Sequence, residues 1–155
     1  MTSRSFSIRK ATIDDLSSLI KIEAECFTDE AFTKNQLEYC LKSSDFITLV
    51  ALIDGEIIGF ITGSMETLAG ETSGHIYTLD IKQRQRKKGF GGKLLDAFES
   101  ALAEKGVRII FLEVRVDNIP ARKLYSKHDY KPFRTLRDYY GPKIDAIMLR
   151  KTLKT

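Results

Sequence analysis

Hydrophobic and polar residues recur along the chain with two periods, and the change of period separates predicted helices from predicted strands. Residues 6–9 alternate apolar and polar side chains, as an edge strand does. Thr12 or Asp14 can then cap a helix, because an apolar stripe follows at Leu16, Leu19, Ile20 and Phe27. A second short helix is predicted over residues 34–42.

The middle of the chain has the pattern of a hairpin followed by another strand. Residues 46–53 are rich in β-branched side chains, Asp54 and Gly55 form a turn, and residues 56–65 return. A second turn is predicted over residues 67–73 and a third strand over residues 74–81.

The second half contains the clearest helix signal, over residues 89–105, with one apolar face and a terminal glycine, Gly106. Residues 107–116 form a strand whose apolar run predicts burial on both faces. Asn118 can cap a helix that has Pro120 in its first turn, and residues 130–153 resemble a hairpin. No repeat or linker interrupts this order, so we expect one mixed α/β domain over residues 1–155.

Composition agrees with an ordinary globular protein of 155 residues, with 43% hydrophobic and 30% charged residues. No apolar run approaches the ~20 residues of a membrane span, and the first ten residues lack the apolar core of a secretory signal. Cys26 and Cys40 have no metal-site spacing and fall in predicted helices, which favours reduced thiols. We therefore expect a cytoplasmic protein with no metal site and no membrane partner.

The basic excess is local. The formal net charge is only +4, yet five of the twelve residues in 84–95, RQRKKGFGGKLL, are basic and none is acidic. Three glycines precede the predicted helix, where backbone N–H groups and the helix dipole favour an anion such as a phosphate. The alternative is a basic turn whose glycines allow tight packing.

The spacing of this loop excludes two phosphate-binding motifs. A Walker loop requires Ser or Thr where Leu94 stands, and a dinucleotide fingerprint requires a third glycine there. The spacing Arg86-x-x-Gly89-x-Gly91 instead resembles the acetyl-CoA motif of the GNAT superfamily of N-acetyltransferases, in which the loop amides hold the CoA pyrophosphate.

A second stretch sharpens this resemblance. Residues 112–130, LEVRVDNIPARKLYSKHDY, are similar to the ribosomal-protein and archaeal-type N-terminal acetyltransferases of that superfamily, and the resemblance extends over residues 74–150. It implies a GNAT fold, which is a central mixed, twisted sheet of about seven strands flanked by about four helices. It also implies acetyl-CoA as cofactor.

The resemblance assigns roles to individual residues. Glu113 corresponds to the catalytic base, Tyr125 to the donor of a proton to the departing thiolate, and His75 to a histidine that assists catalysis. The implied cofactor contacts are Leu79, Asp80, Ile81, Arg86, Lys87, Lys88, Gly89, Phe90, Gly91, Gly92, Asn118 and Tyr125. The expected substrate contacts are Phe27, Tyr77, Tyr139 and Tyr140.

Each of these residues has a structural alternative. Glu113 can form an ion pair with Arg115, two positions on, and Tyr125 can be a core tyrosine. His75 can be an ordinary strand residue, and Tyr139 and Tyr140 can serve only strand packing. Phe27 and Phe32 flank a loop that either lines a substrate pocket or packs the first two helices together.

The sequence departs from the family pattern at several positions. Asp80 stands where small or apolar residues are usual, and residues 128–130, HDY, replace the commoner Leu-Gly-Phe. If the strand bearing Asp80 and Ile81 separates from its neighbour, a backbone N–H there is free to stabilise an oxyanion.

The preferred function is therefore acetyl transfer to the α-amine of a protein or peptide N-terminus, with a ribosomal protein among the candidates. The alternatives are acetylation of a lysine side chain or small amine, and a non-catalytic module that binds CoA or nucleic acid. We expect no nucleic-acid partner, since the basic cluster is confined to one loop. We also expect a monomer or a homodimer.

Overall fold

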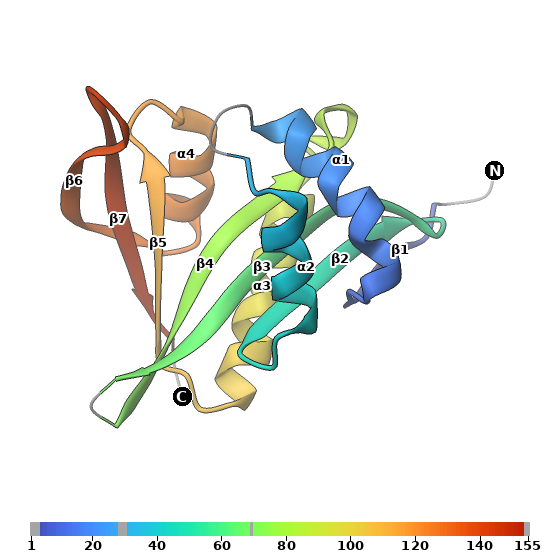
Figure 1. Cartoon of the computed structure of the whole chain (residues 1–155), viewed down its shortest axis with the longest axis horizontal. Coiled ribbons are helices and arrows are strands. Elements are labelled where there is room, and N and C mark those ends of the chain that lie inside the picture. Colours follow the sequence, from blue (N-terminus) through green and yellow to red (C-terminus); the bar gives the residue numbers. More distant parts are fainter. Residues whose placement is uncertain (1–3, 28–30, 69, 154–155) are drawn as a thin grey trace.

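A computed structural model describes residues 4–27, 31–68 and 70–153 of the chain. It contains strands and helices in a mixed order (Figure 1). The strands are β1 (Phe6–Lys10), β2 (Phe46–Ile53), β3 (Glu56–Leu68), β4 (Glu71–Ile81), β5 (Ile109–Arg115), β6 (Lys131–Gly141) and β7 (Ile144–Thr152). The helices are α1 (Leu16–Cys26), α2 (Lys34–Lys42), α3 (Phe90–Glu104) and α4 (Ile119–Lys127), with short 3-10 turns at Ile13–Asp15 and Gln83–Gln85.

The seven strands form one sheet in the order β1-β2-β3-β4-β5-β7-β6. All neighbouring pairs are antiparallel except β4 and β5, which run parallel. The parallel pairing extends only from Ser73 opposite Ile109 to Ile76 opposite Leu112. Beyond Ile76, β4 continues for another five residues without pairing to β5 within the described chain, so the two strands diverge toward their carboxyl ends. This mixed sheet with four helices confirms the predicted fold class.

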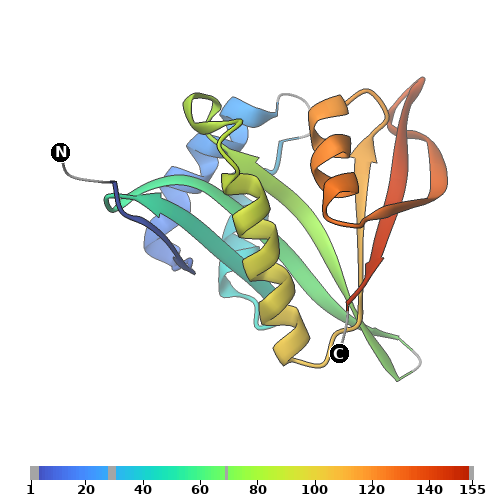
Figure 2. The same ribbon diagram turned by 180° about the vertical axis from the view of Figure 1, so that it is seen from behind.

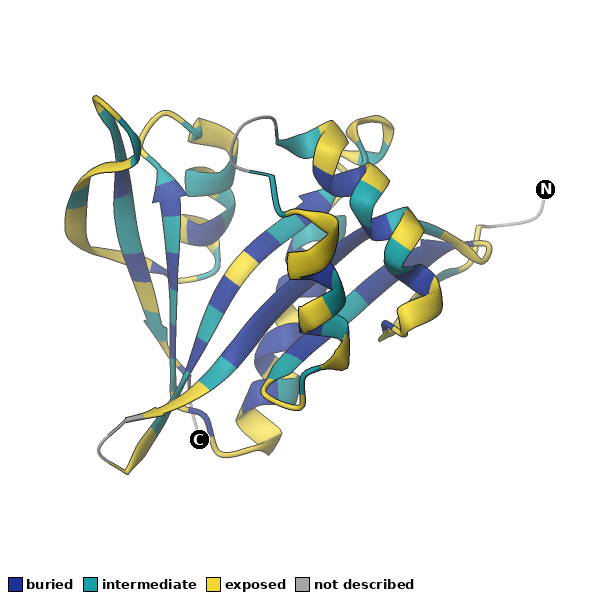
Figure 3. Cartoon of the chain, in the orientation of Figure 1, coloured by how far each residue is buried: buried dark blue, intermediate teal, exposed yellow. Residues whose placement is uncertain are grey.

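Helices cover both faces of the sheet. Figure 1 shows α1 and α2 in front of it, and Figure 2 shows α3 and α4 on the opposite side. A hydrophobic cluster lies on each side: one includes Leu19, Leu37 and Phe60, and the other is centred on α3. Figure 3 shows the buried positions concentrated on the central strands and the inner faces of the helices.

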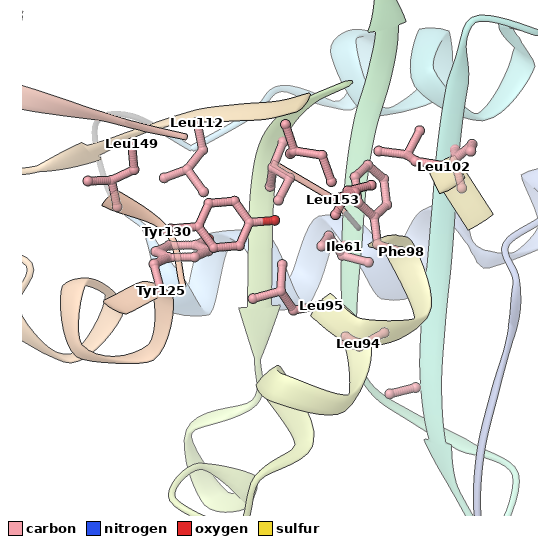
Figure 4. Packing of buried hydrophobic residues seen from close by; sticks show 14 of the residues in the cluster. Ile61, Leu94, Leu95, Phe98, Leu102, Leu112, Tyr125, Tyr130, Leu149 and Leu153 are labelled. Atoms are coloured by element: carbon pink, nitrogen blue, oxygen red, sulfur yellow. The ribbon is translucent and has the colours of Figure 1, made fainter. Parts of the chain in front are cut away.

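The larger cluster joins α3 and α4 to the sheet. Leu94, Leu95, Phe98 and Leu102 are fully buried, which confirms the apolar face predicted for this helix (Figure 4). Tyr125 from α4 lies beside Tyr130 in the same cluster, with ring centroids 5.6 Å apart in an edge-to-face arrangement. Both helices are therefore anchored in the same core.

One glycine is required by the close approach of β3 to β4. A Cβ at Gly63 would lie 2.5 Å from the backbone oxygen of His75 and 2.5 Å from the Phe98 ring. The register between β3 and β4 shifts next to this residue, between Thr62 and Gly63. The strand that carries His75 thus fits against β3 only because residue 63 has no side chain.

Most predicted boundaries agree with the structure to within a few residues. The α2 helix covers the predicted residues 34–42, and the side chain of Asn118 caps α4 by accepting a hydrogen bond from Ala121 N at 3.2 Å. Thr12 is the N-cap of the first helical segment, which is a 3-10 turn that precedes α1. The Asp15 carboxylate accepts a hydrogen bond from Thr12 N at 2.8 Å.

Two predictions about the strands were wrong. The turn predicted over residues 67–73 is shorter, because β3 continues to Leu68 and β4 begins at Glu71. The hydroxyl groups of Thr67 and Thr72 contact each other at 3.0 Å across the extended ladder. Strand β5 is not buried on both faces: Ile110, Leu112 and Val114 are buried, whereas the intervening residues are partly exposed.

In the described ranges, no helix has both the length and the hydropathy that crossing a lipid bilayer requires.

Candidate active site

The pocket that holds the predicted catalytic residues lies where β4 and β5 diverge. It has a volume of about 170 Å³ and is lined from both sides of the sheet. Helix α1 and the segment after it contribute Glu23, Phe27 and Phe32, and β4 contributes residues from His75 to Leu79. The other wall consists of Glu113, Val114, Arg115, Asn118, Ala121, Tyr125, Tyr139 and Tyr140. The divergence of two parallel strands thus creates the opening, since no ladder bonds fill it.

Three predicted residues from three strands form one hydrogen-bonded group. His75 Nε2 lies 2.6 Å from Glu113 Oε2, and the Tyr139 hydroxyl donates to Glu113 Oε1 at 3.2 Å. The two carboxylate oxygens of Glu113 therefore have different partners. His75 is 38 residues from Glu113 in sequence, and the parallel register of β4 and β5 brings the two together.

The protonation of His75 is governed by the acids around it. Burial alone lowers the pKa of His75, but the hydrogen bond and the charge of Glu113, assisted by Glu66, raise that pKa above its ordinary value. Glu66 Oε1 lies 3.7 Å from His75 Nδ1. The carboxylate of Glu113 therefore stabilises the protonated form of His75.

The hairpin of β6 and β7 closes the pocket with two tyrosines. Their rings meet edge to face, with centroids 4.9 Å apart. The Tyr140 hydroxyl donates to the backbone oxygen of Glu113 at 3.3 Å, while Tyr139 binds its side chain. Burial and the Glu113 charge raise the pKa of Tyr139, so its hydroxyl stays protonated as a donor.

Tyr125 lines the same pocket from α4. It is only 7% exposed, and burial raises the pKa of its phenol well above the ordinary value. The phenol therefore keeps its proton at neutral pH. A protonated hydroxyl in a water-poor wall has the chemistry of a proton donor to a developing anion.

A buried acid cluster lies beneath the pocket. Thr78 Oγ1 is 3.0 Å from Glu23 Oε1 and 2.7 Å from Asp80 Oδ1, although the hydroxyl has a single proton to donate. Burial and the neighbouring Glu23 raise the pKa of Asp80 well above its ordinary value, so Asp80 carries the extra proton. Asp80 Oδ2 is the one buried side-chain oxygen or nitrogen without a hydrogen-bond partner in the described chain.

The glycine loop leads from β4 into α3 with the geometry of an anion site. Lys87 and Gly89 have positive φ angles of 64° and 84°. Gly89 occupies the N-cap of α3 and has no side chain to cap the first-turn N–H groups. Left-handed residues in such a loop turn backbone N–H groups toward one side, which favours an anion.

Several predicted cofactor residues have structural contacts that define what they can contribute. The Arg86 guanidinium donates to the backbone oxygen of Ile81 at 3.1 Å and contacts Cys26 Sγ at 3.3 Å, so it fixes the loop to the end of β4. The Phe90 ring stacks on the Phe6 ring, with centroids 5.0 Å apart. The Phe90 ring is therefore engaged in packing, and any contact of Phe90 with a ligand would come from its backbone. Burial raises the pKa of Cys26 to about 11, so this thiol is un-ionised at neutral pH.

Gly92 has a packing role. A Cβ there would lie 2.8 Å from His128 Nε2, so this glycine allows α4 to approach α3. The alternative interpretation of the loop, glycines for tight packing, therefore holds for Gly92, whereas Gly89 with its positive φ does not depend on packing.

The two phenylalanines that flank the loop after α1 line the pocket, and one of them also packs against the helices. Phe27 and Phe32 line the pocket, and Phe32 also packs against the cluster beneath α1 and α2. Residues 28–30 of this loop lie outside the described residues.

Sequence reasoning missed Glu23, Thr78 and Glu66. A signal for Glu23 was present, because it lies four positions after Leu19 and four before Phe27, within the apolar stripe of α1. An acid in such a stripe needs a partner, and Glu23 accepts from Phe32 N at 2.9 Å as well as from Thr78. Glu66 had no such signal, since only the pairing of β3 with β4 brings it near His75.

Comparison with known proteins gives the same family. Residues 13–130 match the acetyltransferase (GNAT) family. An N-alpha-acetyltransferase of Saccharolobus solfataricus is 29% identical, and the match covers 97% of this chain and 95% of the relative. A protein named as an uncharacterized N-acetyltransferase of Methanocaldococcus jannaschii is 34% identical, over 93% of this chain and 90% of the relative.

A solved structure agrees with the arrangement of strands and helices described above. The crystal structure of Ard1 from Thermoplasma volcanium superposes with a TM-score of 0.87 at 27% identity, covering 97% of this chain and 99% of that one. Sequence and fold thus identify the same family over nearly the whole length. The chain belongs to the GNAT family and is an N-acetyltransferase that uses acetyl-CoA.

Proposed function

We propose that this enzyme acetylates the α-amine at the N-terminus of a protein, with Glu113 and His75 removing a proton from the amine and Tyr125 supplying one to the leaving thiolate. The observation that carries the proposal is the group formed by His75, Glu113 and Tyr139 in the pocket wall. The family resemblance of these residues and the N-alpha-acetyltransferase relatives support the same acceptor.

An incoming amine must be neutral before it can attack a carbonyl carbon, so the site needs a proton acceptor. Glu113 Oε2 and His75 Nε2, 2.6 Å apart, hold one proton between them when His75 is neutral. They take a second proton from the ammonium and release it to solvent before the amine attacks. The proton that the nitrogen loses after the attack then replaces the one that Tyr125 gives to the thiolate. Tyr139 donates to the other oxygen of Glu113, which keeps the carboxylate plane fixed while the proton moves. The acids around His75 then stabilise the imidazolium that results.

The described residues fit acetyl-CoA. It supplies the thioester carbonyl that the amine attacks and the sulfur that departs. The uncapped first turn of α3, with the left-handed Lys87 and Gly89 before it, is suited to the pyrophosphate through backbone N–H groups. Lys88 and the other exposed basic residues of the loop add charge. The protonated Tyr125 phenol, which lines the same pocket, can serve as the acid.

The strand end between Tyr77 and Ile81 offers stabilisation of the oxyanion. Beyond Ile76 the ladder to β5 ends, so the β4 edge that faces the pocket is free of β5. A backbone N–H of this edge supplies a preorganised donor, without any side chain having to move.

The pocket favours an α-amine over a lysine side chain because of its hydroxyl groups. An α-amine brings its own first backbone amide and carbonyl into the pocket, and buried polar groups need partners. The hydroxyls of Tyr139 and Tyr140 lie beside Glu113 and can pair with them. A lysine side chain enters with four apolar methylene groups and leaves its backbone outside.

The test measures thiol release from acetyl-CoA with two sets of peptides. One set has free N-termini beginning with Ser, Ala, Met or Thr and contains no lysine; the other has blocked N-termini and one internal lysine. Turnover confined to the first set is the expected result. Turnover confined to the blocked peptides would replace the proposal with lysine acetylation, and turnover of neither would direct the search to small amines.

A further inference from the structure

A row of aromatic rings leads away from the catalytic group across the α2 side of the sheet. The His75 and Tyr77 rings lie 4.3 Å apart, Tyr77 and Phe46 5.5 Å, and Phe46 and Tyr39 5.8 Å. Phe32 joins the row, 6.2 Å from Tyr77. The rings come from β4, the start of β2 and α2. Strand β3 lies between β2 and β4, and Figure 1 shows α2 in front of these strands.

These rings are not simply core. Tyr39 is 63% exposed and Tyr77 is 40% exposed, while Phe46 is partly buried between them. A contiguous apolar surface of this kind on a globular protein commonly marks a binding site. We call the row of His75, Tyr77, Phe46 and Tyr39 the aromatic row.

Three rings of the aromatic row, Tyr77, Phe46 and Tyr39, line a groove that adjoins the active-site pocket. The groove has a volume of about 370 Å³ and is lined by Phe32, Asn35, Gln36, Tyr39, Cys40, Phe46 and Tyr77. Phe32 and Tyr77 also line the active-site pocket, so the two hollows share a wall. The two hollows therefore adjoin at Phe32 and Tyr77, and a ligand that extends from the pocket into the groove passes over these two rings.

The lining of the groove fits an uncharged polypeptide segment. It contains rings, the amides of Asn35 and Gln36, and an un-ionised thiol, but no acidic or basic side chain. Two of the charged side chains on α2, Glu38 and Lys42, pair with each other at 3.0 Å. Amide side chains can donate to and accept from a peptide backbone, while the rings contact apolar side chains.

The length of the row sets which residues of a substrate it meets. An extended chain advances about 3.3 Å per residue, so about five residues span the three ring-to-ring steps from His75 to Tyr39. With the amine held at Glu113 and His75, the ring-to-ring steps reach Tyr77 at about the second residue, Phe46 at about the fourth and Tyr39 at about the fifth or sixth. The third to fifth residues therefore lie along the row between Tyr77 and Tyr39.

We propose that the aromatic row is a subsite for the third to fifth residues of the acceptor polypeptide and selects apolar or aromatic side chains there. This inference rests on the proposed N-terminal acetylation. It adds a selection by residues beyond the first two, made by α2 and the start of β2 rather than by the pocket itself.

The test compares peptides that share their first two residues and an Arg-Arg tail, with Leu-Phe-Leu or Ser-Gly-Ser at positions three to five. The wild-type protein should show a kcat/KM about three- to tenfold higher for the apolar peptide, mainly through KM. In Tyr39→Ala the KM for the apolar peptide should rise, and the ratio between the two peptides should approach one. Phe133→Ala is the matched control, because Phe133 is an exposed aromatic residue on β6, outside the groove.

Four results would overturn the inference. Equal kcat/KM for the two peptides in the wild type, or a preference that persists in Tyr39→Ala, leaves N-terminal acetylation intact and removes the subsite. A concentration-dependent dimer that Tyr39→Ala abolishes, without a change in peptide preference, assigns the groove to a second copy of the chain. No turnover of either free-N-terminus peptide removes the proposed function and the subsite together.

Discussion

Replacing Glu113 with glutamine removes one negative charge from the site while keeping the shape of the side chain. The oxygen of the introduced amide can still accept from the Tyr139 hydroxyl, and the amide nitrogen can donate to a neutral His75. The variant should therefore fold, and its effects should report the lost charge and the lost proton acceptor.

Two magnitudes separate catalysis from stability. Loss of a general base lowers kcat by about 10² to 10⁴, equivalent to about 3–5 kcal/mol of transition-state stabilisation. A hydrogen bond to a charged group exceeds a neutral one by about 1 kcal/mol, which for a protein of this size lowers Tm by only about 2–4 °C. A large fall in kcat with a small fall in Tm is the expected combination.

The assay is a pH–rate profile combined with a histidine titration by NMR. In the wild type, the pKa of His75 is raised by Glu113, so kcat/KM should increase as pH rises through an apparent pKa above the ordinary histidine value. In Glu113→Gln the pKa of His75 should fall, because its charged partner is gone. The chain has only two histidines, and His128, which contacts Asp96 at 3.2 Å, provides the internal reference.

Glu66→Gln is the matched control. Glu66 also faces His75, at 3.7 Å from Nδ1, but it lies at the exposed end of the site and should lower kcat/KM by less than tenfold. If Glu113→Gln retains more than about a third of the wild-type kcat/KM while remaining folded, Glu113 is not the base, since loss of a base lowers the rate by about 10² or more.

Three further substitutions test other parts of the structure. Asp80→Asn should flatten the pH dependence of stability. The pKa of Asp80 is raised in the folded state, so its contribution to stability is present at acidic pH and is lost as pH rises through that pKa. The Tm of the variant should therefore increase relative to that of the wild type from pH 5 to pH 8. If the Tm values of Asp80→Asn and of the wild type changed in parallel with pH, this prediction would be contradicted. Gly63→Ala should destabilise the protein by about 1–3 kcal/mol and lower kcat, because its Cβ displaces the backbone of His75; an unchanged Tm would refute the close approach. Tyr125→Phe should keep Tm within about 3 °C and lower kcat by about 10² or more, and near-normal turnover would mean that another group protonates the thiolate.

Local signals in the sequence predicted most elements of the fold. The apolar spacing of Leu37 and Leu41 identified α2 to the residue, and the Asn118 cap predicted the start of α4. The hairpin between β3 and β4 was predicted too short, because polar residues such as Thr67 and Thr72 can extend a ladder beyond the core when their hydroxyls pair. Such pairing leaves no hydrophobic period to detect.

The sequence predicted which residues belong to the candidate site, but not how they contact one another. The resemblance to the family named Glu113, His75 and Tyr139, but their mutual contacts depend on the non-local pairing of β4 with β5 and on the last hairpin. The same holds for the groove of the aromatic row, whose rings come from three separate elements. Neither periodicity nor spacing contains the register that aligns them.

The short parallel contact between β4 and β5 also determines when activity can arise during synthesis. The chain emerges with the glycine loop and His75 first, whereas Glu113, Tyr125 and Tyr139 follow in the last third of the sequence. Because β7 lies between β5 and β6, the final hairpin must dock on β5 before Tyr139 reaches Glu113. A nascent chain that already has its anion loop therefore lacks its proton-transfer group, and acetyl transfer begins only when the C-terminal strands have closed the site.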